Sequence, residues 1–82
     1  MTDRSTTAQV RNPLLALPGA VRIGRLPKPA RDALRELLMD IKRDAATRAQ
    51  KAWKQHKAPM ACYWKAVSVY AGHAARLCRD SY

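Results

Sequence analysis

Apolar residues recur at three- and four-residue steps through most of the second half of the chain. The first series has no Gly or Pro between Ala30 and Ala58, and its spacing places one apolar stripe along a continuous helix. Its members are Ala30, Leu34, Leu37, Leu38, Ile41, Ala45, Ala49, Ala52 and Trp53. We therefore predict an amphipathic helix over about 30–57, preceded by Pro29, a residue that is tolerated in a first helical turn.

A second apolar series follows Pro59 and reaches the end of the chain. Its members are Met60, Tyr63, Trp64, Val67, Tyr70, Ala71, Ala74, Ala75 and Cys78. Because proline ends one helix and is accepted in the first turn of the next, we predict a second helix over about 59–79. We expect Tyr63, Trp64 and Tyr70 to lie in the core. Two long helices joined by a few residues predict an all-α fold, an antiparallel helical hairpin.

The first third of the chain has a different pattern. Residues 1–12 are polar around one isolated valine, which predicts a flexible terminal arm. Residues 13–29 hold four of the five prolines and two of the three glycines, with leucine, valine and isoleucine between them. This pattern predicts an irregular or short-helical apolar strap that lies over the helices. With 82 residues, we expect one domain over 1–82.

A hairpin of two helices that is rich in alanine buries little apolar area. Such a hairpin needs a further cover on its remaining apolar face, because small domains are marginally stable. The strap, a second copy of the chain or another partner can supply that cover. We favour the strap, with homodimerisation in addition.

Charge is distributed unevenly along the two predicted helices. The chain has 16 Lys and Arg against 6 Asp and Glu, a net charge of +10. Residues 30–44 carry four acids and four bases, whereas residues 45–79 carry seven bases and no acid. We expect this acid-free half to form a positive binding surface around the turn. The expected contact residues are Arg48, Lys51, Trp53, Lys54, His56, Lys57, Lys65 and Arg76.

Three kinds of partner can bind a positive surface. An acidic surface on another protein is the leading interpretation, and sequence-tolerant binding to nucleic acid is the alternative. Base-specific readout is disfavoured because apolar residues, Met60 to Trp64, occupy the start of the second helix, where a helix-turn-helix protein carries polar groups. A peripheral membrane helix is disfavoured because the aromatic stripe is needed for the core.

The chain lacks the patterns that indicate catalysis, a metal or a cofactor. His56 and His73 have no further ligand at metal-binding spacing, and there is no Gly-rich phosphate loop. Cys62 and Cys78 lie 16 residues apart on one predicted helix, roughly 24 Å, which is too far for a disulfide. We expect two buried thiols in a non-enzymatic protein without cofactors. The absence of a leader pattern and of a long apolar run predicts a cytoplasmic location.

The segment 53–73 (WKQHKAPMACYWKAVSVYAGH), after a helix rich in Ala and Arg, resembles small early-region proteins of temperate transposable phages of proteobacteria. The resemblance covers the last two thirds of the chain. It implies a host-takeover or accessory protein that binds a machine of the bacterial host, such as a CRISPR complex, a type IV pilus motor or a transcription regulator, and inhibits or modulates it. It brings no functional residues to positions here. The basic charge departs from acidic inhibitors that mimic DNA.

Overall fold

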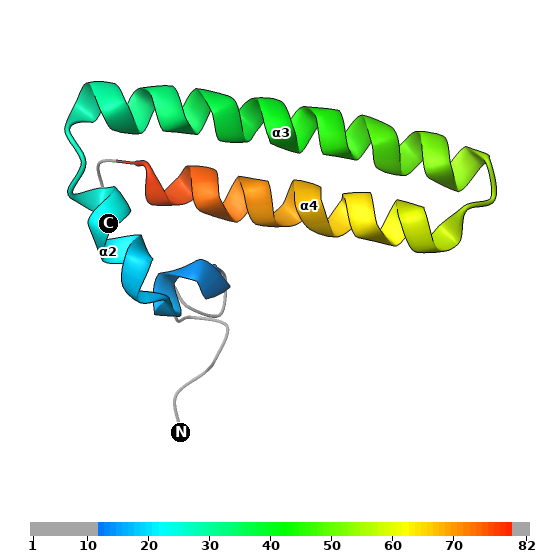
Figure 1. Ribbon diagram of the computed structural model, residues 1–82, viewed down its shortest axis with the longest axis horizontal. Coiled ribbons are helices and arrows are strands. Elements are labelled where there is room, and N and C mark those ends of the chain that lie inside the picture. The colour runs from blue at the N-terminus through cyan, green and yellow to red at the C-terminus, as the bar shows by residue number, and fades with distance from the viewer. Residues whose placement is uncertain (1–11, 80–82) are drawn as a thin grey trace.

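The computed structural model of the chain describes residues 12–79. It contains a 3-10 helix, η2 (Pro13–Ala16), and three α-helices, α2 (Pro18–Gly24), α3 (Lys28–Lys54) and α4 (Ala58–Leu77), with no strand in this range. α3 and α4 run antiparallel and pack along their length (Figure 1). The predicted all-α helical hairpin with a short-helical N-terminal segment is confirmed. The predicted arm 1–12 lies outside the described residues except for Asn12.

The first long helix ends three residues before the predicted boundary, because the chain leaves the helix at His56. This residue has φ 59°, in the left-handed region. The Lys57 N–H donates to the Ala52 carbonyl at 2.9 Å, and the His56 N–H donates to the Trp53 carbonyl at 3.0 Å. This pair of bonds is the Schellman arrangement that closes many helices. Pro59 then lies in the first turn of α4, as predicted.

The contact between α3 and α4 is made mainly by alanine. The buried apolar residues are Ala45, Ala49, Ala52, Ala61, Ala71, Ala75, Leu77 and Cys78, and no large side chain among the described residues is fully buried. Small side chains let the two backbones approach closely. The hydroxyl of buried Ser68 donates across this contact to the Lys42 carbonyl at 3.0 Å. The core is therefore close-packed but thin.

The described part of the chain is flat. α3 and α4 lie side by side in one layer (Figure 1). η2 and α2 pack against α4 near its C-terminal end (Figure 1), where the Asn12 side-chain amide donates to the His73 carbonyl at 2.9 Å. Leu17 and Val21 of this segment are more than half exposed. The strap thus caps one end of the hairpin and does not cover it, contrary to expectation.

Several side chains predicted in the core are exposed. Tyr63 is 61% and Tyr70 is 53% exposed, and Met60 is 51% exposed. Cys62 is exposed as well, whereas Cys78 is buried as predicted. The apolar stripe of α4 is wider than the narrow row that α3 covers, so only the small residues in its centre are buried. Trp64 is half-buried.

Candidate partner-binding surface

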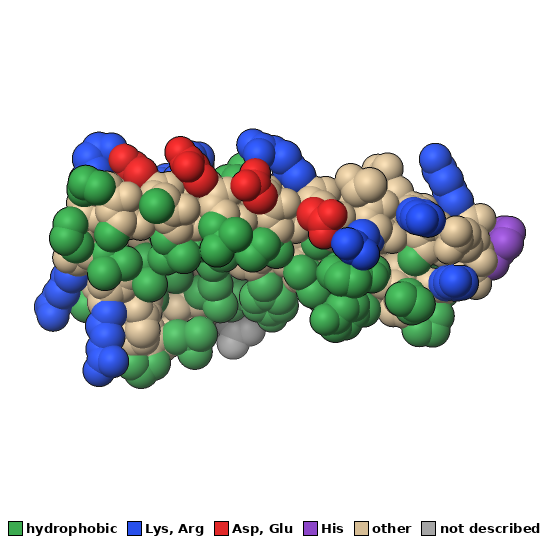
Figure 2. Space-filling view, turned by 45° about the horizontal axis from the view of Figure 1, so that its top comes forward, with side chains coloured by type: hydrophobic (Ala, Val, Ile, Leu, Met, Phe, Trp, Pro, Cys, Tyr) green, Lys and Arg blue, Asp and Glu red, His purple; other side chains and the backbone are tan. Residues whose placement is uncertain are grey.

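The two flanks of the buried row on α4 have opposite character. Successive helical residues turn by about 100°, so residues seven positions apart share a side. One flank carries Lys65, Gly72 and Arg76, and the other carries Tyr63, Val67, Tyr70 and Ala74. We call the first side of the hairpin the basic face and the second the apolar face. Figure 2 shows hydrophobic side chains in a band along the hairpin, below the acidic side chains of α3.

The basic face has a groove beside the turn, here called the turn groove, with a volume of about 560 Å³. Alanines from both helices form much of its lining, and Trp53, Lys54 and Lys65 contribute the large side chains. Its lining residues are Ala49, Gln50, Trp53, Lys54, Ala61, Cys62, Lys65 and Ala66. Trp53 is 67% exposed. An indole exposed to this extent beside two ammonium groups offers an aromatic anchor inside a positive rim.

A second hollow beside the turn is lined by Trp53, Lys54, His56 and Ala58. Trp53 and Lys54 line both hollows, so the indole stands between them. His56 lines the second hollow, and its backbone has the left-handed conformation, which is costly for a residue with a Cβ. The structure thus brings together four of the predicted contact residues, Trp53, Lys54, His56 and Lys65. Lys51 and Lys57 are exposed but line neither hollow.

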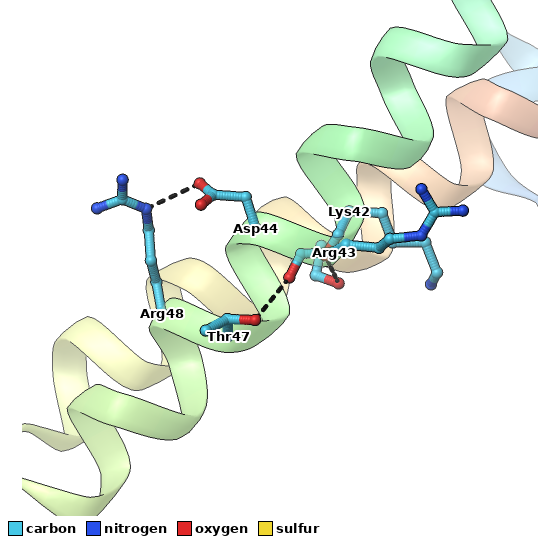
Figure 3. Close-up of polar contacts among 6 residues, drawn as sticks. Lys42, Arg43, Asp44, Thr47 and Arg48 are labelled. Carbon is cyan, nitrogen blue, oxygen red and sulfur yellow. Dashed lines mark hydrogen bonds and ion pairs between the residues drawn. The ribbon is translucent and has the colours of Figure 1, made fainter.

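Arg48 lies apart from this cluster. Its Nε donates to an Asp44 carboxylate oxygen at 2.8 Å (Figure 3), and its guanidinium carbon lies 5.0 Å from the centre of the Trp64 ring. This cation–π contact joins α3 to α4. Arg48 thus has an acidic partner on α3, although residues 45–79 themselves contain no acid. Its contacts are structural, and we remove it from the candidate site.

Arg76 lies toward the other end of the basic face. It lines a hollow of about 150 Å³ with Arg35, Met39, Lys42, Gly72, Ala75 and Arg79. A Cβ at Gly72 would lie 3.1 Å from the Lys42 Nζ, so the missing side chain makes room for the lysine to lie across α4. No acid is among the described residues that line this hollow. Arg35 and Lys42 were not predicted as contact residues, because they lie in the charge-balanced part of the sequence, residues 30–44. Their seven-residue spacing, which places both on one side of the helix, was the sequence feature that could have identified them.

The four acids among residues 12–79 all lie on α3, and three form ion pairs within the chain. Lys28 pairs with Asp32 at 2.8 Å, Arg43 with Asp40 at 3.3 Å and Arg48 with Asp44 at 2.8 Å. The Lys28 hydrogen bond lowers the pKa of Asp32 below its ordinary value. These exposed pairs add little stability. The three pairs together carry no net charge, in contrast to the hollows of the basic face, whose described lining residues include bases and no acid.

The described residues offer no group of three His, Cys, Asp or Glu side chains that could hold a metal ion. Burial raises the pKa of the Cys78 thiol, opposed by the positive charges of Arg31 and Arg35. A neutral buried thiol is a poor nucleophile. The surface is suited to binding carboxylates and an apolar side chain.

Within residues 12–79, none of the helices has the length and apolar character needed to cross a membrane. Comparison of the chain with protein families, with curated proteins and with solved structures gives no match. The binding proposals below therefore rest on this chain's own residues, and only the host-directed role rests on the resemblance of segment 53–73.

Proposed function

We propose that this protein is a non-enzymatic accessory protein that binds an acidic surface of a host protein and changes that protein's activity. The observation that carries the proposal is Trp53, 67% exposed in a groove whose other large side chains include Lys54 and Lys65. The phage-type role follows from the resemblance of segment 53–73. The binding role follows from the surface.

The lining of the turn groove favours a protein partner over nucleic acid. Protein interfaces combine an apolar, desolvated centre with a polar rim, and Trp is enriched among the residues that dominate binding energy. The groove has this form, with alanines and Trp53 at the centre and the two lysines beside them. A partner segment with an apolar side chain between carboxylates fits it. Binding to the phosphodiesters of nucleic acid would use the positive charges of the two lysines but would not need the apolar lining of the groove.

The direct test is capture of partners from a lysate of the bacterial host, treated with nuclease, followed by mass spectrometry. We expect the wild-type chain to retain one host protein and the double variant Lys54→Glu/Lys65→Glu to lose it. The matched control Arg22→Glu/Arg25→Glu makes the same change in net charge on two exposed residues, one in the last turn of α2 and one at its C-cap. It should retain the host protein.

Equal loss of the host protein in both double variants would contradict the proposal, because net charge alone would then decide binding. Release of the bound material by nuclease would favour the nucleic-acid alternative. With the partner in hand, Trp53→Ala should weaken binding by about 2 kcal/mol or more, roughly 30-fold, as expected for an anchor residue. A smaller loss than that from single lysine substitutions would remove Trp53 as the anchor.

A further inference from the structure

The apolar face of the hairpin is large and uncovered. A groove of about 510 Å³ runs along it, lined by Leu38 and Ile41 of α3 and by Tyr63, Val67 and Tyr70 of α4. Leu14 of η2 reaches one part of it. Tyr63 and Tyr70 are more than half exposed, and Ile41 is 37% exposed. Folded domains bury such a face against a second layer of structure, and α3 and α4 supply only one layer (Figure 1).

We propose that a second copy of this chain supplies the missing layer, so that two hairpins pack through their apolar faces as a four-helix bundle. The two-fold arrangement sets each apolar face against the same face of the other copy, which is the usual form of a symmetric dimer. The basic faces then lie on the two outer sides of the dimer. Each keeps its turn groove open for a partner.

The distribution of charge selects the face through which copies meet. With a net charge of +10 per chain, two copies repel each other unless they meet where charge is absent or balanced. The only charged residues of α4 are Lys65 and Arg76, and both line hollows of the basic face. On α3, the neighbouring charges Asp44 and Arg48 already form an ion pair. None of the described residues that line the apolar groove carries a charged side chain.

The size of the face also fits a dimer. The 20 residues of α4 make a helix about 30 Å long, and two packed helices are roughly 20 Å wide, so each face offers on the order of 600 Å². Two such faces bury about 1,200 Å² in total, the lower end of the range for specific interfaces. The hairpin's own core consists largely of alanine. Burial of the aromatic face thus contributes to folding as well as to association.

Sedimentation of the purified chain tests this inference. We expect the wild-type protein to sediment at twice the 9.2 kDa mass of one chain. Tyr70→Glu should raise the dimer dissociation constant at least about 100-fold, because each interface would bury unpaired charges. Val69→Glu is the matched control, since Val69 is the adjacent residue, is 41% exposed and lies outside the apolar groove. It should remain dimeric.

A second measurement covers the case in which Tyr70→Glu fails to fold. The thermal midpoint of the wild-type chain should rise with concentration between about 1 and about 100 µM, as it does when unfolding is coupled to dissociation. A helical wild-type monomer with a midpoint independent of concentration would overturn the proposal, as would an undisturbed dimer of Tyr70→Glu. Capture of a host protein through Lys54 and Lys65 does not depend on these results, so the two proposals fail separately.

Discussion

His56 occupies the position after a helix where glycine is most common. Its φ of 59° costs a side-chain-bearing residue about 1 kcal/mol relative to glycine. Strained backbone is often retained where the side chain has a role, and His56 lines a hollow with Trp53 and Lys54. His56 lies at the edge of the proposed site, so we interpret the energetic cost of its backbone conformation as the consequence of a role of its side chain in partner binding.

We therefore predict that His56→Gly raises the free energy of unfolding by about 1 kcal/mol and weakens capture of the host protein. Thermal unfolding followed by circular dichroism, with the capture assay beside it, checks both parts. A loss of stability would show that the side chain stabilises the turn. Full partner binding in the more stable variant would remove His56 from the site.

At this scale the sequence predicted some residues and missed others. The burial of Cys78 was predicted. Trp53 was placed both on the apolar stripe of the first helix and among the expected contact residues, and the structure exposes its indole. The left-handed turn was missed because its usual sign, a glycine, is absent. The exposure of Cys62 was also missed, since residue type alone favours burial of a thiol.

At the scale of elements, the two cysteines near the two ends of α4 have different surroundings. Cys62 is exposed and lines the turn groove, while Cys78 is buried at the C-terminal end of α4, close enough to Arg31 and Arg35 of α3 to feel their charge. Desolvation raises the pKa of Cys78 above its ordinary value of 9.0, so the folded chain keeps this proton to higher pH than the unfolded chain. The stability that this group contributes is present below pH 9.0 and is lost as pH rises through its raised pKa.

Alkylation distinguishes the two thiols. Iodoacetamide at about pH 8 should modify Cys62 in the folded protein and leave Cys78 unmodified until denaturant is added, because the thiolate is the reacting species. Mass spectrometry of the digested protein reads both sites. Equal rates at the two cysteines in the folded protein would show that the end of α4 is open.

The helices themselves were predictable, and their buried side was not. The three- and four-residue spacing located both helices to within a few residues. It also marked a stripe from Met60 to Cys78 as core, but one neighbouring helix covers only the row of Ala61, Ser68, Ala71 and Ala75. The spacing of apolar residues shows which side chains share a face of a helix. It does not show how much of that face a neighbouring helix covers.

At the scale of the whole molecule, α3 and α4 form a single layer that has a basic face and an apolar face. The basic face carries Trp53 with Lys54 and Lys65, and the apolar face carries Tyr63 and Tyr70. The sequence predicted a need for further cover, but it assigned most of that cover to the strap. The strap folds into η2 and α2, which are too short to lie along two long helices, and it packs near the C-terminal end of α4 (Figure 1).

The central claim is that the apolar face binds a second copy of the chain while the basic face binds the partner. Oxidative footprinting of the aromatic side chains tests it most directly, first at rising protein concentration and then with the captured partner added. We predict that Tyr63 and Tyr70 lose reactivity as the chain dimerises, while Trp53 stays reactive until the partner is added. Protection of Trp53 by concentration alone, or tyrosines that stay reactive in the concentrated protein, would contradict the account.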